Sequence, residues 1–293
     1  MKYFKMLLLA SAVLLFTACG GGGGSSNNGG EAQKSMLTIT DQNANRVMGA
    51  SMLSIQGVQN LDDIFGSNSL SVVSRSMAKI NKLGNIASKD QAVAPLAESG
   101  NETCSGGGTV SYNIDDNGGF YVFNNCVEDN IGLTLDGKAT ATINGNILNV
   151  EYTNFSLDSH YYNLSVYYQN VKVTIDQSNY NMNGSITGYV NSDGNKIEYD
   201  QYIFSKTGNK YLYNGFVKTN CMGNWIELKT VKTLELSDYG YGCPTAGEVI
   251  AIGNNSELKT VFNTDKSVNV YLNGEVYTTY SDCNELPSTC EGD

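Results

Sequence analysis

Few residues of this sequence are of a type that could carry catalysis or hold a metal. The chain of 293 residues has one histidine, His160, which cannot supply a cluster of imidazole ligands. The serine-hydrolase elbow and a complete phosphate-binding loop are both missing from the sequence. We therefore predict no catalytic residue, no cofactor and no metal, and a protein that is not an enzyme. A hydrolase built on two carboxylates stays open as an alternative, because sequence spacing does not reveal such a pair.

Two short segments rich in acids and amides, residues 115–117 and 191–195, could contribute oxygen ligands to calcium. Neither has the spacing of an EF-hand loop, which ends in a glutamate. Asn, Asp and Gly adopt left-handed backbone angles at low cost, so turns explain both segments. We expect turns there rather than calcium sites.

Of the seven cysteines, Cys19 stands apart near the N-terminus, and the other six are candidates for disulfides. Cys19 follows the N-terminal apolar run, and removing it leaves an even number, as disulfides require. An oxidising compartment outside the cytoplasm favours disulfides among these six. Fifteen pairings are open from sequence alone. The equal spacing within two successive pairs favours three local bridges: Cys104–Cys126, Cys221–Cys243 and Cys283–Cys290.

The first 18 residues have the pattern of a signal peptide. Lys2 and Lys5 precede an apolar run over residues 6–16. As a helix this run would cover about 16 Å at ~1.5 Å per residue. The hydrocarbon core of a bilayer is roughly 30 Å thick, so the run is too short to span it.

The residues just before Cys19 are small, and this arrangement resembles the bacterial lipoprotein signal and lipobox. The resemblance implies cleavage before Cys19, lipidation of its sulfur and acylation of the new amino group. Gly20 stands where an aspartate would retain such a protein at the inner membrane, so the expected location is the outer membrane, facing the periplasm or the outside. An ordinary secretory signal is the alternative.

A tether is predicted after the lipid anchor. Residues 19–35 are rich in Gly, Ser and Asn and contain almost no core-forming side chains. Two or more acyl chains hold a protein stably on a membrane, whereas one chain binds only marginally. The membrane is therefore an expected partner, reached through the anchor.

The net charge of −11 and the presence of only two arginines, Arg46 and Arg75, argue against nucleic acid as a partner. Charged residues make up 16% of the chain, against roughly 25% in average soluble proteins. Polar uncharged residues replace them, which is typical of a β-rich protein outside the cytoplasm.

Two amphipathic helices are predicted within residues 36–100, a stem and linker. One follows Asp41, its expected N-cap, and has an apolar stripe from Ala44 to Ile55. The other has such a stripe over residues 70–83. Each helix must bury its stripe against another element.

Residues 101–293 are predicted to form an antiparallel β domain. Apolar and polar residues alternate, and Asn-Gly or Asp-Gly pairs such as Asn273-Gly274 separate the alternating segments. This spacing predicts a meander of ten to fourteen strands. The fold class is mainly β: a large curved sheet, a half-barrel or a sandwich, with the two helices over the apolar face. Some pairs, such as Asn183-Gly184, fit a kink inside a strand instead.

Tyrosine is the most suggestive enrichment, with 19 in the chain. Adjacent pairs such as Tyr167-Tyr168 direct their rings to opposite faces of a sheet, so one ring of each pair lies outside the core. Exposed tyrosines beside amides can stack on sugars or contact a protein. Ordinary cross-strand pairing explains them equally well. Ten tyrosines fall in the central strands: Tyr152, Tyr161, Tyr162, Tyr167, Tyr168, Tyr189, Tyr199, Tyr202, Tyr211 and Tyr213.

Residues 104–110 (Cys-Ser-Gly-Gly-Gly-Thr-Val), Cys126 and residues 243–253 (Cys-Pro-Thr-Ala-Gly-Glu-Val-Ile-Ala-Ile-Gly) carry a further resemblance. They are similar to a loose group of uncharacterised bacterial lipoproteins with a lipobox, a short helical segment and a long β-meander. A tyrosine usually stands in that group where this chain has Cys243. The resemblance implies location and architecture and no activity.

Two functions are consistent with these features. The first is a non-enzymatic outer-membrane lipoprotein that binds a glycan or a protein or has a structural role in the envelope. The second is a carrier that holds a lipid or acyl chain beneath its helices. A large apolar cavity would favour the carrier, and a filled interior would favour the first function.

Overall fold

The computed structural model describes residues 34–66, 98–115, 117–129, 132–160, 163–176, 178–179, 181–192, 195–236 and 243–287. The signal peptide, Cys19, most of the tether and the helix predicted at 70–83 lie outside these residues. Within them, one α-helix, α2 (Ala44–Gly66), precedes the strands. The stem of two helices is thus not supported. The helix begins at Ala44, so Asp41 lies three residues before it, in the preceding turn, and is not its N-cap.

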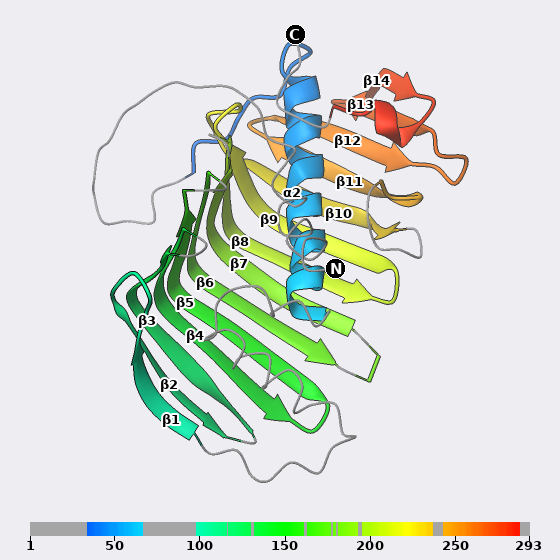
Figure 1. Ribbon diagram of the computed structural model, residues 1–293. Coiled ribbons are helices and arrows are strands. Elements are labelled where there is room, and N and C mark those ends of the chain that lie inside the picture. Colours follow the sequence, from blue (N-terminus) through cyan, green and yellow to red (C-terminus); the bar gives the residue numbers. More distant parts are fainter. Residues whose placement is uncertain are drawn as a thin grey trace. The chain divides into compact units, whose positions relative to one another are not determined.

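The rest of the chain is a meander of fourteen antiparallel strands, the upper limit of the predicted number, in one open sheet (Figure 1). Each strand lies beside the next one in sequence. A short 3-10 helix, η3 (Cys283–Glu285), follows the last strand. The strands are β1 (Glu98–Thr103), β2 (Thr109–Asp115), β3 (Gly118–Glu128), β4 (Leu133–Asn144), β5 (Ile147–Ser159), β6 (Leu164–Asp176), β7 (Asn181–Ser192), β8 (Asn195–Thr207), β9 (Lys210–Thr219), β10 (Ile226–Glu235), β11 (Ala246–Gly253), β12 (Ser256–Phe262), β13 (Val268–Leu272) and β14 (Glu275–Tyr280).

The turn residues explain why successive strands pair. Asn273 and Gly274 both have positive φ, at 51° and 87°, and they join Leu272 to its partner Glu275. Positive φ at both central residues is the requirement of a type I′ hairpin turn, whose twist matches that of the strands. The pair Asn183-Gly184, in contrast, lies inside β7, paired with β6.

The chain separates into two compact units. Among the described residues, the first unit contains 58–66, 98–192 and 205–208, and the second contains 34–57, 195–204 and 209–287. In both units one face of the sheet is buried, here called the inner face, and the other is the outer face. Alternate residues such as Val171 and Val173 are 0% and 1% exposed, whereas Lys172 between them is exposed.

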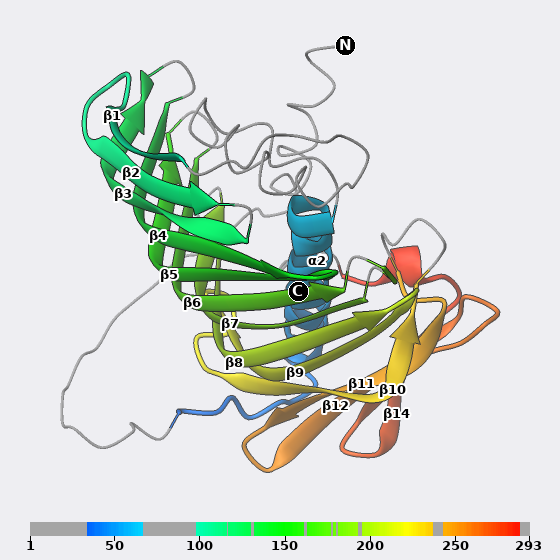
Figure 2. The same ribbon diagram turned by 90° about the horizontal axis from the view of Figure 1, so that it is seen from below.

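The first half of α2 lies over the inner face of β9–β12 in the second unit (Figures 1 and 2). Val47, Met48, Leu53 and Ile55 are at most 2% exposed. Burial is wider than the predicted stripe, because Ser51 and Ser54 are also buried. Their hydroxyls donate to the helix carbonyls of Val47 and Ala50, both at 2.7 Å, which satisfies them without a partner from the sheet.

β-Bulges, in which a strand has one residue more than its partner, bring aromatic side chains that are three positions apart onto the inner face. Tyr152 and Phe155 are both buried, although residues at i and i+3 of a regular strand face opposite sides. The extra residue, Asn154, has φ of 45° and shifts the register with β4. Gln201 repeats this conformation in the second unit, with φ of 48°.

A glycine on the neighbouring strand accommodates each extra residue. A Cβ on Gly215 would meet the Cα of Tyr202 at 2.4 Å and the carbonyl oxygen of Gln201 at 2.5 Å. Its φ of 138° lies in the region that glycine adopts at low cost. Gly137 has the same role beside Asn154.

Of the three predicted disulfides, one is confirmed and two are wrong. Cys104 and Cys126 are bonded, with Cα atoms 5.4 Å apart, as predicted. Cys243 is bonded to Cys283, with Cα atoms 5.9 Å apart, so the pairs Cys221–Cys243 and Cys283–Cys290 are wrong. Cys221 is also disulfide-bonded, and Cys290 lies outside the described residues.

The meander explains the correction. Cys221 and Cys243 lie on either side of one strand, β10, whose ten residues span about 33 Å. A disulfide needs Cα atoms roughly 4.4–6.8 Å apart, and in the structure Cys243 reaches Cys283 instead. Four strands, β11–β14, separate Cys243 from Cys283 and return the chain to the same end of the sheet.

Candidate functional site

The inner face of the sheet holds most of the predicted tyrosines in its core. In the first unit Tyr152 is 7% exposed and its ring lies 6.4 Å from that of Tyr168. Burial raises the pKa of Tyr168 to about 12, and it raises the pKa of Tyr152 further, with a contribution from Tyr168. Both hydroxyls are therefore neutral at physiological pH, and their rings act as core side chains.

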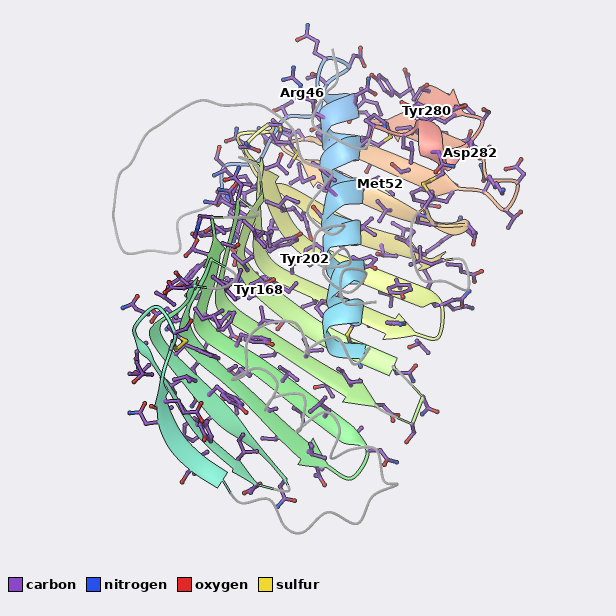
Figure 3. The ribbon with its side chains drawn as sticks, in the orientation of Figure 1. Arg46, Met52, Tyr168, Tyr202, Tyr280 and Asp282 are labelled. Carbon is purple, nitrogen blue, oxygen red and sulfur yellow. A yellow bond between two sulfur atoms is a disulfide. The ribbon has the colours of Figure 1, made fainter. Side chains whose placement is uncertain are left out.

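The second unit has a matching tyrosine cluster on β8 and β9. Tyr202 is fully buried, with its ring 5.3 Å from that of Tyr199 and 6.4 Å from that of Tyr213. The Tyr202 hydroxyl finds no hydrogen-bond partner among the residues that the structure describes. Burial raises its pKa well above the ordinary value. Tyr202, on β8, and Met52, on α2, are both labelled in Figure 3.

Tyr167 and Tyr189, two of the tyrosines predicted in the central strands, lie half-exposed on the outer face of the first unit. Tyr167 and Tyr189 are directly opposite each other on β6 and β7, with ring centroids 5.7 Å apart. The Tyr167 hydroxyl donates to Oδ1 of Asn154 at 3.3 Å. Tyr168, the neighbour of Tyr167, lies on the inner face, which confirms that adjacent tyrosines separate to the two faces. Tyr161 and Tyr162 lie outside the described residues.

Small polar residues surround this tyrosine pair. Ser156 is paired with Tyr167, and the next outer row contains Asp158, Ser165 and Asn191. A polar sheet face with two half-exposed aromatic rings has the chemistry of a glycan- or protein-binding surface, because the rings offer rigid contact area and the amides offer hydrogen bonds.

The outer face of the second unit differs from that of the first. It carries lysines paired with acids, among them Lys218 with Glu198 at 3.5 Å and Lys229 with Glu227 at 3.4 Å. Apolar side chains are exposed between these pairs. On β8, β9 and β10 these are Ile203, Leu212 and Val231, which are 51%, 39% and 49% exposed.

His160 and the two acidic segments do not form a common site among the described residues. In the part of the chain that the structure describes, no group of three or more His, Cys, Asp or Glu side chains could hold a metal ion. Asp115 accepts a hydrogen bond from the backbone N–H of Asn117 at 2.8 Å, which is turn chemistry. His160 lies in an exposed turn after β5. Asp193 and Gly194, in the second acidic segment, fall outside the described residues.

The described residues contain no helix long and apolar enough to cross a lipid bilayer.

No family model matches the sequence, and neither a curated protein nor a solved structure matches it. The similarity to β-meander lipoproteins therefore stays a prediction.

Proposed function

We propose that the protein is a non-enzymatic lipoprotein of the bacterial outer membrane, anchored through Cys19, whose sheet binds a macromolecule of the envelope. The observation that carries this proposal is the difference between the two faces of the sheet: the inner face is buried, and the outer face is not. In the second unit α2 occupies the inner face, with Met48 and Leu53 at most 2% exposed. The outer faces are left for a partner.

The Tyr167–Tyr189 pair is the surface on which we expect a glycan or protein partner to bind. Its rings are half-exposed, lie 5.7 Å apart and stand among hydroxyl and amide side chains. Stacking on tyrosine rings and hydrogen bonding to amides together suit a sugar or a polar peptide surface. The net charge of −11 gives no support to nucleic acid as a partner.

Metabolic labelling with an alkyne fatty acid tests the anchor. The protein should take up the label and sediment with outer membranes, whereas the Cys19→Ser variant should take up none and appear in the soluble fraction. Label on the Cys19→Ser variant, or a wild type without label, would contradict the proposal.

Binding is tested with a glycan array and with co-purification from envelopes. Replacing both Tyr167 and Tyr189 by Ser should remove the bound partner. Tyr271→Ser is the matched control, because Tyr271 also lies on the outer face, beneath Lys259 at 4.7 Å, in the other unit. Equal loss of the partner from both variants would contradict a specific role for the tyrosine pair.

The alternative, a carrier of a lipid or acyl chain, is supported by the wide apolar inner face. It requires a sheet curved into a half-barrel around a ligand rather than a sandwich. Native mass spectrometry of the purified protein decides between the two. A stoichiometric lipid other than the anchor would favour the carrier.

A further inference from the structure

The segment that follows the predicted tether is built into the second unit. Leu37 donates its backbone N–H to Trp225 at 2.8 Å and accepts from Asn254 at 2.7 Å. Trp225 donates to Ser35 at 3.0 Å, and the backbone N–H of Ile39 donates to Ser256 Oγ at 2.7 Å. The tether therefore ends at a fixed point beside the first residues of β10.

Lys34, the first described residue, lies on the outer face of the second unit. It forms an ion pair with Asp200, and its ammonium lies 4.5 Å from the centroid of the Phe216 ring. Phe216 faces outward, because the next residue, Val217, is fully buried. The described chain thus begins with a side chain that lies on the outer face.

Trp225 stands on the same face, with Lys218 5.8 Å from its ring centroid. It is the only tryptophan of the chain. Tryptophan and lysine together are typical of membrane interfaces, since the indole prefers the headgroup level and the lysine stem packs on apolar surface while its ammonium stays in water.

Three exposed aliphatic side chains continue this surface across neighbouring strands β8, β9 and β10. Ile203 and Leu212 face outward because their neighbours Tyr202, Tyr211 and Tyr213 are buried. Val231 is exposed at the point where the register of β10 with β9 and β11 shifts. Together they add three exposed aliphatic side chains to this part of the second unit. We call the whole surface the tether-side face; it consists of Lys34, Ile203, Leu212, Phe216, Trp225 and Val231.

The charges on and beside the tether-side face are nearly balanced, although the chain as a whole carries −11. Lys34 is paired with Asp200, Lys229 is paired with Glu227, and Lys196 and Lys218 share Glu198. A neutral surface avoids the repulsion that an acidic surface meets at an anionic membrane. Zwitterionic lipid is the surface that this face suits best.

We infer that the tether-side face rests on the lipid surface that holds Cys19. The inference depends on the proposed lipid anchor. Fifteen residues, 19–33, separate the anchor from Lys34, and a flexible chain of that length has a mean span of roughly 20 Å. The face at which the tether ends is therefore held close to the membrane. Its aromatic, aliphatic and lysine side chains have the chemistry to remain there.

The sole tryptophan makes a direct test possible. The lipidated full-length protein is reconstituted into phosphatidylcholine vesicles with and without lipids brominated on their acyl chains, which quench nearby indole. We expect brominated lipid to remove most of the Trp225 emission from the lipidated protein. The Cys19→Ser protein, mixed with the same vesicles, should keep its emission.

Two variants distinguish docking of this face on the bilayer from mere proximity of Trp225 to the bilayer through the tether. Leu212→Ser combined with Val231→Ser should restore the emission of the lipidated protein. Val276→Ser should not, although Val276 is 67% exposed, because it lies on the edge strand β14. All three side chains are exposed, so the variants retain the folded body.

Distinct results would overturn the inference. Lipidated protein quenched no more than the Cys19→Ser protein would show that the face is away from the lipid. A blue shift that grows with protein concentration in the absence of vesicles would assign the face to a second copy of the chain. An unmodified Cys19 peptide in the mass spectrum would instead refute the anchor itself, and the docking with it.

Discussion

Tyr202 and Tyr112 are both buried tyrosines whose hydroxyls have different surroundings. The hydroxyl of Tyr112 donates to Glu102 at 2.9 Å, whereas that of Tyr202 is buried with no partner within the described ranges. Because an unsatisfied buried hydroxyl costs about 1–3 kcal/mol, we expect Tyr202→Phe to leave the free energy of unfolding unchanged or to raise it by ~1 kcal/mol. Tyr112→Phe should lower it by about 1 kcal/mol. Urea unfolding followed by circular dichroism measures both, and a clear loss of stability in Tyr202→Phe would show that its hydroxyl has a partner.

Tyr168 should make stability depend on alkaline pH. Burial raises its pKa from 10.0 to about 12 in the folded protein. The folded state therefore holds the phenolic proton of Tyr168 more tightly than the unfolded state. This contribution to the free energy of unfolding is complete below pH 10 and is lost as the pH rises toward 12. The slope should reach about 1.4 kcal/mol per pH unit for this group. Rapid urea unfolding of wild type and Tyr168→Phe between pH 9 and pH 12 tests this, since the variant should show the shallower decline.

At the scale of single elements, the close pairing of neighbouring strands depends on the glycines that face the extra residues. Gly215→Ala would place a Cβ 2.4 Å from the Cα of Tyr202, so β8 and β9 must separate. We expect the free energy of unfolding to fall by more than about 2 kcal/mol. Gly274→Ala is the control, because its φ of 87° is also positive but nothing lies within 4 Å of the added Cβ. It should cost about 1 kcal/mol from backbone strain alone, and equal losses in the two variants would refute the close-contact explanation.

The strands could be predicted from sequence because their signal is local. Alternation such as Val171–Val173 and the turn at Asn273-Gly274 need no knowledge of distant residues. The extra residues also have a local signal, because aromatic residues stand three apart around Asn or Gln in Tyr152–Phe155 and Tyr199–Tyr202. Leu37 and Ile39 alternate with threonines in the same way, and this could have marked the segment that pairs with Trp225.

The disulfides were harder to predict because pairing depends on the number of strands between two cysteines. The same spacing covers β2 and most of β3 between Cys104 and Cys126, but only one strand, β10, between Cys221 and Cys243. An even number of strands returns the chain to the same end of the sheet, and an odd number leaves it at the opposite end unless the segments outside the strands make up the distance. The candidate binding surfaces could be predicted only in part. Adjacent tyrosines implied one outward ring, whereas the cluster around Phe216 and Trp225 arises from strand pairing and from a segment far away in sequence.

The bonded pairs lead to a mapping prediction. With Cys104–Cys126 and Cys243–Cys283 formed and Cys19 lipidated, we expect Cys221 to be linked to Cys290. Proteolysis under non-reducing conditions followed by mass spectrometry should yield these three linked peptides. A peptide joining Cys221 to Cys243 would contradict the structure, in which Cys243 is bonded to Cys283.

At the scale of the whole molecule, the boundary between tether and folded body is placed at Lys34. Cleavage within residues 20–33 should release a body of unchanged stability, because the described hydrogen bonds begin at Ser35. A chain that begins at Thr40 loses the four hydrogen bonds of Ser35, Leu37 and Ile39 and the burial of Ile39, which is 2% exposed. At about 0.5–1.5 kcal/mol for each bond, several kcal/mol of unfolding free energy should be lost. Urea unfolding of the two truncated proteins compares them directly. Equal stability would mean that residues 34–39 belong to the tether, and the tether-side face would then have no fixed connection to the anchor.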